Sequence, residues 1–229
     1  MMLKLGVPSK GRLMEKTFEW FGARGVEMEK PEDREYAGEV SGVDGVSLVL
    51  LSAGEIPREL AAGRIHLGVT GTDLVRERLA GWSGRVEELA LMGFGQADLV
   101  IAVPQFWVDV DTIDDLDAAA AAFRARHGMR LRIATKYHRL MRDYLREKGV
   151  ADYQLVDSQG ATEGTVRNET AEAIADITST GDTLRANHLR MLSDGPVLAS
   201  QATLFRSRTA EWDEPTRKSL ARLQARLDL

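Results

Sequence analysis

The chain has 229 residues, of which 44% are hydrophobic and 28% are charged, proportions typical of a globular protein with one large domain or two smaller lobes. Its formal net charge of −5 argues against nucleic acid as the main partner, because proteins that bind the phosphate backbone normally carry a basic face. No apolar run approaches the roughly 20 residues of a membrane-spanning helix, so no membrane partner is expected. A polar loop after Pro8 interrupts any signal-peptide core, and we expect a cytoplasmic protein.

Cysteine and histidine usage restricts the possible chemistry. The chain has no cysteine, which excludes disulfides, thiolate metal ligands and cysteine nucleophiles. Its 4 histidines lie far apart in the sequence, which argues against a histidine-rich metal centre. We also find no Ser/His/Asp arrangement, and we expect the histidines to be structural or exposed.

Strands and helices alternate through the first half of the chain, with apolar runs followed by short glycine-containing turns. The predicted strands are 3–7, 46–51, 65–70, 86–91 and 99–103. The predicted helices are 12–24, one that opens at 55–57, and 74–79. Pro104 closes the last of these strands and is a candidate lobe boundary.

The alternation resumes beyond Pro104 with a set of strands of its own. The predicted strands are 131–134, 153–156, 173–177 and 197–200, and the predicted helices are 112–126, 137–148, 184–188 and 211–229. This pattern predicts an α/β architecture with mostly parallel sheets. The break near Pro104 favours two lobes of about a hundred residues each over one wide sheet. Ligands in such folds bind beyond the carboxyl ends of the strands.

The most informative motif follows the strand 173–177. Asp176 stands at the end of this apolar strand, so its carboxylate must be solvated, paired or used. The turn that follows offers hydroxyls, a glycine and backbone N–H groups at a helix start, which together can hold a phosphate. The predicted phosphate-binding residues are Thr178, Ser179, Thr180, Gly181, Asp182 and Thr183. The alternative is a purely structural turn in which Thr180 or Asp182 caps the helix.

Three other segments carry weaker signals. Lys10, Gly11 and Arg12 place two cations on a glycine turn at a strand end, which suits polyphosphate, although a solubilising loop explains them equally well. Thr135 and Lys136 repeat this pattern, with a helix cap and a surface lysine as the alternative. Arg34 alone is uninformative, since a surface ion pair is the default for an arginine. A further candidate for a ligand contact, standing in a glycine-containing loop, is Glu163.

Taken together, these segments resemble the catalytic chain of ATP phosphoribosyltransferase, and the resemblance covers essentially the whole chain. The most specific piece is 163–184, which follows the family signature of Glu163, Asp176, Thr180–Gly181 and Thr183. Supporting pieces are 10–13, Ile56–Pro57, 67–69, 93–95 and 134–137. Because the chain ends after the helix at Leu229, it resembles the short form of the family, which lacks an extra regulatory domain.

The resemblance implies a two-lobed fold of the periplasmic-binding-protein type (type II). It places lobe I at 1–104 plus 185–229 and lobe II, with the phosphoribosyl pyrophosphate site, at 105–184. It implies that ATP and phosphoribosyl pyrophosphate condense to N1-(5-phosphoribosyl)-ATP and pyrophosphate, with Mg²⁺ carried by the substrate phosphates rather than by a metal site of the protein. It also implies a homodimer and a hetero-oligomer with a regulatory subunit similar to histidyl-tRNA synthetase.

The resemblance also assigns roles to residues. Catalysis is expected of Asp176, Glu163 and Arg34, and substrate binding of Lys10, Gly11, Arg12, Thr135, Lys136 and Thr178 through Thr183. One departure matters for this assignment: Glu169 stands where the family signature has glycine, just before the strand that carries Asp176. Two alternatives remain, namely a solute-binding protein of the same two-lobed shape and a phosphoribosyltransferase for another base.

Overall fold

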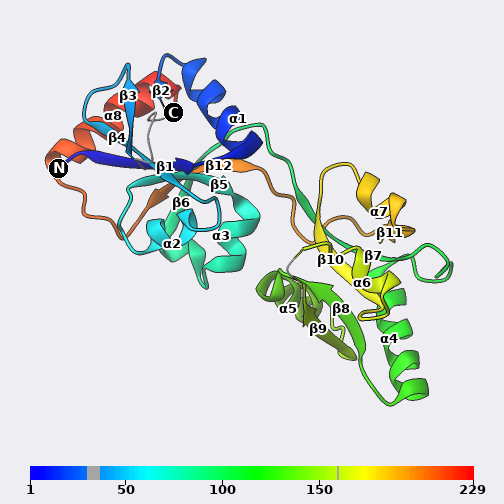
Figure 1. The fold of residues 1–229 in the computed structure, drawn as a ribbon. Helices are drawn as coiled ribbons and strands as arrows, with labels where there is room; N and C mark the ends of the chain where they lie inside the picture. Colours follow the sequence, from blue (N-terminus) through cyan, green and yellow to red (C-terminus); the bar gives the residue numbers. More distant parts are fainter. Residues whose placement is uncertain (30–36, 159) are drawn as a thin grey trace. The chain divides into compact units, whose positions relative to one another are not determined.

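The structure is a computed structural model that describes residues 1–29, 37–158 and 160–229 (Figure 1). The chain divides into two compact units. The first unit comprises Met1–Gln96 and Gln201–Leu229, and the second comprises Ala97–Ser200. The chain therefore passes from one unit to the other twice, as a two-lobed fold requires.

The first unit is built on a seven-stranded sheet. Its strands are β1 (Leu3–Pro8), β2 (Glu27–Glu29), β3 (Ala37–Ser41), β4 (Val46–Leu51), β5 (Leu67–Gly71), β6 (Val86–Leu91) and β12 (Ala202–Ser207). They lie in the order β2-β3-β4-β1-β5-β12-β6. β1 pairs in parallel with β4 and β5, whereas the strands at both sides pair antiparallel. The central strands are covered on both faces, which explains their nearly continuous apolar sequence.

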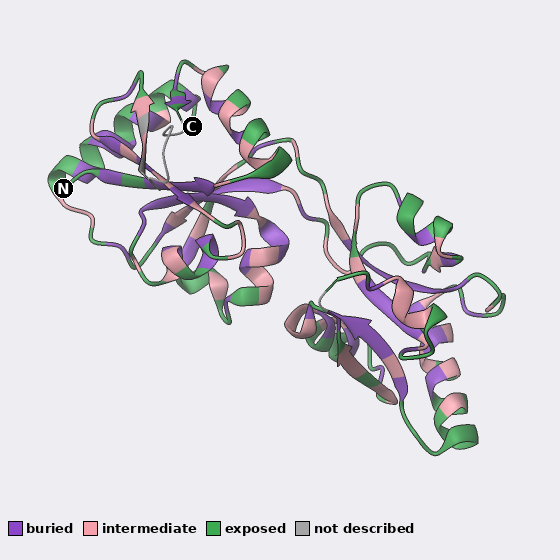
Figure 2. Cartoon of the chain, viewed as in Figure 1, coloured by how far each residue is buried: buried purple, intermediate pink, exposed green. Residues whose placement is uncertain are grey.

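Helices cover both faces of this sheet. They are α1 (Gly11–Gly22), α2 (Ile56–Ala61), α3 (Thr72–Arg78) and α8 (Glu214–Leu227), with a short 3-10 helix at Trp82–Gly84. Phe21 of α1 and Leu223 of α8 belong to one core cluster with β1 and β4. Leu60 of α2 and Val75 of α3 belong to another with Phe205 of β12. Figure 2 shows the buried strands between these half-buried helices.

The second unit is built on a five-stranded sheet. Its strands are β7 (Asp98–Pro104), β8 (Leu131–Thr135), β9 (Tyr153–Asp157), β10 (Ala173–Thr178) and β11 (Leu189–Met191), in the order β11-β7-β10-β8-β9. Its helices are α4 (Ile113–His127), α5 (His138–Glu147), α6 (Gly164–Arg167) and α7 (Asp182–Ala186). The core cluster that includes Leu116 of α4 and Met141 of α5 is distinct from the one that includes Leu184 of α7. β10 therefore runs through the middle of a sheet with a core on each face.

Polar side chains and glycines fix the ends of the longer helices. Thr112 and Asp115 form a capping box before α4, and Gly128 ends that helix with φ 70°. Asp213 accepts a hydrogen bond from the Thr216 N–H at 2.9 Å at the start of α8. Hydrogen bonds from the Thr216 backbone and side chain lower the pKa of Asp213 to about 2.

The structure corrects the predicted mostly parallel arrangement, because both sheets are mixed. Parallel pairs among the described strands are confined to β1 with its two neighbours and to β8 with β9 and β10. β7 pairs antiparallel with β10, which places 98–104 in the second unit although the sequence assigned it to the first. β11 pairs with β7, so residues up to Ser200 also belong to the second unit rather than ending at 184.

One predicted strand is wrong and several were missed. Residues 197–200 form only an isolated bridge between Leu198 and Leu99. The strand of this region is β12, which the sequence analysis did not predict, and which inserts antiparallel between β5 and β6. The short strands β2, β3 and β11 were also missed. None of the helices within the described ranges has the length and apolar character needed to span a membrane.

Candidate functional site

β10 carries Asp176 to one end of the second sheet. The strand lies between β8 and β7, and Ala173, Ile174 and Ala175 are buried in the sheet. The Asp176 side chain keeps 18% of its surface exposed, because the strand emerges from the core at this residue. The strand thus places a carboxylate at the surface on a rigid support.

The two carboxylate oxygens of Asp176 have different surroundings. Its Oδ1 accepts a hydrogen bond from the Ile177 N–H at 2.8 Å and lies 3.3 Å from Lys136 Nζ. Within the described part of the chain, no group donates a hydrogen bond to Oδ2. The carboxylate is held in place through one oxygen and presents the other to a ligand. Oxygen acceptors of this kind suit ribose hydroxyls or a hard cation, and they disfavour direct contact with phosphate.

The turn between β10 and α7 is fixed by its own hydrogen bonds. The Gly181 N–H donates to Thr178 Oγ1 at 2.8 Å, which closes the turn. Gly181 has φ 75°, a left-handed conformation that favours glycine. A Cβ at Gly181 would lie 3.1 Å from Arg185 Nη1 and 3.4 Å from Met191 Cε. The left-handed backbone therefore favours glycine here, and any other residue would also displace the ends of the Arg185 and Met191 side chains by a few tenths of an ångström.

Asp182 and Arg185 brace the same turn. Thr180 Oγ1 donates a hydrogen bond to Asp182 Oδ2 at 2.6 Å, and Arg185 Nη2 donates to Asp182 Oδ1 at 2.6 Å and to the Thr180 carbonyl at 3.0 Å. The hydrogen bonds from Thr180 and then Arg185 lower the pKa of Asp182. These contacts match the alternative reading of Thr180 and Asp182 as structural residues.

The remaining groups of the turn are available to a ligand. Among the described residues, none accepts a hydrogen bond from the backbone N–H groups of Ser179, Thr180 or Thr183, and the hydroxyls of Ser179 and Thr183 are exposed. Backbone N–H groups that converge in a turn are a common way to bind phosphate. α7 has only 5 residues, so its dipole adds little, and the turn itself supplies the donors.

Two small hollows share Thr178, Ser179 and Thr180. One has a volume of about 200 Å³ and is also lined by Glu163, Asp176, Asp182 and Thr183. The structure thereby places Glu163, at the start of α6, beside the turn. The other has a volume of about 210 Å³ and is also lined by Asp98, Val100, Gly181, Met191, Leu192, Gly195 and Pro196.

The second hollow contains residues that the sequence analysis missed. Asp98 starts β7, Met191 ends β11, and Pro196 stands in the loop after it, so their meeting with Ser179 depends on strand pairing. No local motif marks them.

Thr135 and Lys136, although adjacent, differ in their access to the site. Thr135 is fully buried, and its Oγ1 accepts a hydrogen bond from the Tyr137 N–H at 2.9 Å. This geometry favours a structural role for its hydroxyl. Lys136 is exposed, and its ammonium group joins Asp176 as described above. Of these two adjacent residues, Lys136 is therefore the one whose side chain can reach a substrate.

The other predicted cations lie elsewhere in the chain. Lys10 and Arg12 belong to the first unit, where both are exposed, and no described carboxylate forms an ion pair with either. Gly11, between them, has φ 74°. Arg34 lies outside the described residues.

Glu169 adopts the conformation that explains why the family signature has glycine at this position. Its φ is 58°, in the left-handed region that disfavours residues with a side chain. The Arg132 guanidinium donates to the Glu169 carbonyl at 3.0 Å and to Glu172 Oε1 at 2.5 Å. Arg132 and Glu172 are both mostly buried, and this double contact holds the strained segment against the start of β10.

The metal-ligating groups of this region are carboxylates that line the first hollow. In the segments 1–29, 37–158 and 160–229, no three His, Asp or Glu side chains are grouped so that they could hold a metal ion. Asp182, which also lines the hollow, is bonded to Thr180 and Arg185. Asp176 Oδ2 and Glu163 are the carboxylate groups left there that could contact a cation already bound to a phosphorylated ligand.

Comparisons with known proteins place this geometry in a family. The family model described as ATP phosphoribosyltransferase matches residues 52–228. A protein of that name from Cereibacter sphaeroides is 74% identical over 230 residues, which cover 100% of this chain and 97% of the relative.

Solved structures show the same fold. The ATP phosphoribosyl transferase (HisG:HisZ) complex from Thermotoga maritima matches 99% of this chain and 96% of that chain, with a TM-score of 0.74 and 22% identity. The substrate-binding protein of an amino acid ABC transporter matches 99% of this chain and 91% of that chain, with a TM-score of 0.51 and 11% identity. The fold is thus the two-lobed type II fold that the sequence predicted. The family model and the 74% identical relative show that this chain belongs to the ATP phosphoribosyltransferase family, the transferases of the first step of histidine biosynthesis.

Proposed function

We propose that the turn between β10 and α7 binds the 5-phosphate of phosphoribosyl pyrophosphate and that Asp176 accepts hydrogen bonds from its ribose hydroxyls. The observation that carries this proposal is the free backbone N–H groups of Ser179 and Thr180 beside a hollow lined by Asp176 and Glu163. Phosphate and ribose hydroxyls are adjacent in the substrate, just as donors and a carboxylate are adjacent in this hollow.

The reaction needs positioning more than proton transfer. The adenine N1 of ATP carries a lone pair, which forms the new bond to C1 of the ribose while the bond from C1 to the pyrophosphate oxygen breaks. Pyrophosphate departs with the electron pair of that bond. Positive charge develops on the ribose ring, and the carboxylates of Asp176 and Glu163 lie where they can stabilise it. Holding two substrates in line supplies the rest of the catalysis.

We propose that lysine and arginine side chains bind the pyrophosphate and the phosphates of ATP. Lys136 stands beside Asp176, and the exposed Lys10 and Arg12 are free of described ion pairs. Arg34 stays a candidate from the family resemblance. Mg²⁺ enters on the substrate phosphates in this proposal, where it offsets the charge of the leaving pyrophosphate.

We further propose that the chain dimerises and works with a regulatory subunit similar to histidyl-tRNA synthetase. The complex from Thermotoga maritima, which shares the fold, supports a hetero-oligomer. A cytoplasmic location is supported by the nucleotide substrate of the family.

Replacement of the strand-end carboxylate tests the assignment. Asp176→Ala should lower kcat/KM by at least tenfold, about 1.4 kcal/mol of transition-state stabilisation, with the fold intact by circular dichroism. The assay mixes ATP and phosphoribosyl pyrophosphate, with and without the regulatory subunit, and follows the absorbance of phosphoribosyl-ATP. Asp157→Ala, at the end of β9, which β8 separates from β10, is the matched control and should retain activity. Normal kinetics for Asp176→Ala would refute the role of Asp176.

A further inference from the structure

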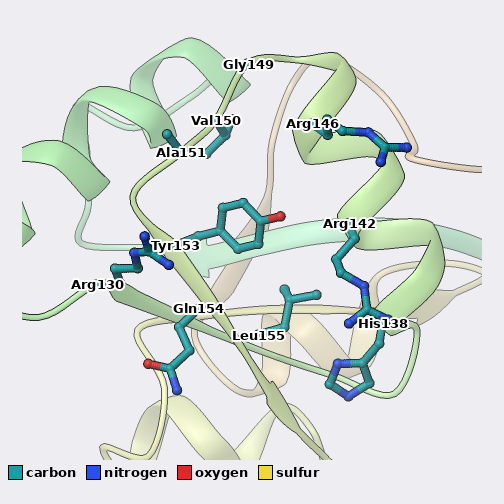
Figure 3. Close-up of a pocket in the computed structure, with 10 residues that line it drawn as sticks. All are labelled: Arg130, His138, Arg142, Arg146, Gly149, Val150, Ala151, Tyr153, Gln154 and Leu155. Carbon is teal, nitrogen blue, oxygen red and sulfur yellow. The ribbon is translucent and has the colours of Figure 1, made fainter.

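A large hollow with a basic lining lies in the second unit, apart from the phosphate turn (Figure 3). Its volume is about 670 Å³, and it is formed by α5, the start of β8, β9 and the loop that leads to β9. We call it the basic groove, defined by Arg130, His138, Arg142, Arg146, Tyr153 and Leu155. None of the described residues that line it is an aspartate or a glutamate, although the chain as a whole carries a net charge of −5.

Two of its guanidinium groups have no partner in the described chain. Arg146 Nη2 lies 2.8 Å from Asp143, and His138 Nε2 lies 3.2 Å from Asp157. Arg130 and Arg142 form no ion pair with any described residue. Exposed ion pairs such as that of Arg146 contribute little and are readily exchanged. The groove therefore presents cations that an external carboxylate can bind without first displacing a buried partner.

The cations on α5 form a row rather than a ring. His138, Arg142 and Arg146 are four residues apart, so they lie on one face of the helix at intervals of about 6 Å. Tyr153 and Leu155 of β9 line the same groove, with His138 and Arg142 shown on the helix beside the strand in Figure 3. A linear row favours an extended ligand over a compact anion, for which the cations would converge.

The strand beside this row is an edge strand. β9 is the last strand in the order of its sheet and pairs only with β8 among the described strands. Its outer side therefore offers backbone N–H and C=O groups for another strand. Its half-buried side chains Tyr153 and Leu155 supply apolar contact area. Backbone pairing at an edge combined with side-chain pockets is a known mode of peptide recognition.

We propose that the basic groove docks an extended acidic segment of a partner protein, which adds as a strand to the edge of β9. In an extended segment, residues i and i+2 lie about 6.6 Å apart on one face. This distance matches the spacing of about 6 Å between Arg142 and Arg146. The segment should therefore carry two carboxylates separated by one residue, facing these two arginines.

A synthetic peptide tests this proposal on the full chain. The probe is acetyl-Thr-Val-Glu-Val-Glu-Val-Thr-amide, and its control replaces both Glu by Gln. Binding is measured by isothermal titration calorimetry at low and high salt, and hydrogen exchange of the β9 amides reports strand addition. We expect binding of the Glu peptide only, weaker at high salt because exposed charges are screened, with slowed exchange along β9.

Charge reversal in the groove identifies the site. R142E/R146E should weaken binding of the Glu peptide at least tenfold, and the milder Arg142→Gln about threefold, with phosphoribosyltransferase activity unchanged. R222E/R226E is the matched control, since these arginines have the same spacing on α8 in the first unit. Equal binding to R142E/R146E, or binding without protection of β9, would overturn the proposal. So would a single-stranded oligonucleotide that binds the groove while the peptide does not. Because activity is measured separately, failure here leaves the proposed function unaffected.

Discussion

The turn between β10 and α7 and the turn between β1 and α1 each follow a buried strand and lead into a helix through a left-handed glycine, Gly181 with φ 75° and Gly11 with φ 74°. In the first of these turns, Thr178 Oγ1 accepts a hydrogen bond from the Gly181 N–H, and Thr180 and Arg185 donate further hydrogen bonds within the turn. The second has no side-chain cap hydrogen bond and a Lys10 side chain exposed to solvent. The β10 turn is held by several side-chain hydrogen bonds and carries few cations. The β1 turn carries two cations and has few hydrogen bonds that hold its side chains.

This difference bears on how each turn would treat a phosphate. A preorganised set of N–H groups loses little freedom when it binds, and its effect depends on geometry. Flexible ammonium and guanidinium groups bind through charge, and their effect depends on ionic strength. The β10 turn should therefore fix the position of a substrate, and the β1 turn should raise the affinity for a polyanion without fixing it.

The largest expected effect comes from the glycines. Gly181→Ala forces a Cβ against Arg185 Nη1 and Met191 and disfavours the left-handed backbone by about 1–2 kcal/mol. KM for phosphoribosyl pyrophosphate should rise about tenfold or more. Gly11→Ala meets no atom of the described residues within 4 Å, so the backbone penalty is its expected cost and it should raise KM less. Steady-state kinetics measures both. Equal effects of the two variants would show that the β10 turn has no special role.

Removal of charge should produce the next largest effect. Lys10→Gln and Arg12→Gln should each raise KM for the polyphosphate substrates about threefold at low salt, in line with the modest strength of exposed ionic contacts. The effect should shrink at high salt, whereas that of Gly181→Ala should not. The control is Arg217→Gln, an exposed cation on α8. Salt-independent losses for Lys10→Gln would contradict the assignment of charge to the β1 turn.

The sequence predicted the β10 turn well because its signals are local. An apolar run that ends in Asp176 and a glycine between hydroxyl residues are read along the chain, and the structure places them as predicted, with Glu163 at the same hollow. The sequence could not predict which side chains of the turn bond to one another and which stay available to a ligand. The hydrogen bonds that Asp182 accepts from Thr180 and Arg185 depend on side-chain directions, which the spacing of residues in the sequence does not fix.

Long-range pairing limited the prediction of the fold. Strand and helix alternation gave the α/β class, but it implied parallel neighbours, and β12 instead returns from the second unit to insert antiparallel between β5 and β6. The same limit hid Asp98 and Met191, which reach Ser179 only through strand pairing. Composition could not reveal the basic groove either, because a net charge of −5 conceals a local excess of arginine.

A smaller effect, on stability, is expected at Glu169, the residue with a left-handed backbone just before β10. Glu169→Gly should raise the free energy of unfolding by about 0.5–1 kcal/mol, because relief of the left-handed strain exceeds the entropy that glycine adds to the unfolded chain. Glu169→Ala keeps the strain and should leave stability nearly unchanged. Urea denaturation measures both. If Glu169→Gly destabilises the protein, the side chain contributes contacts that outweigh its backbone strain.

The smallest expected effect is a dependence of stability on pH, caused by a histidine that packs against β1, the strand before the β1 turn. His66 is buried, its Nδ1 accepts a hydrogen bond from the Lys4 N–H of β1 at 3.0 Å, and its Nε2 lies 3.1 Å from the Glu211 carbonyl. These partners require a neutral ring with the proton on Nε2, and burial lowers its pKa from 6.5.

Protonation of His66 should therefore oppose folding. Because the folded pKa is the lower one, the unfolded chain binds the proton first, and the stability present above pH 6.5 should fall as pH drops below that value. Trp212, whose ring lies 5.0 Å from that of His66, is one of 4 tryptophans. Unfolding of the first unit is therefore followed by its fluorescence in a Trp107→Phe background, which removes the tryptophan of the second unit. His66→Gln should flatten the pH dependence, and His138→Gln, in the second unit, should not. A pH dependence that persists in His66→Gln would mean that another group titrates, and that β1 and its turn do not depend on this imidazole.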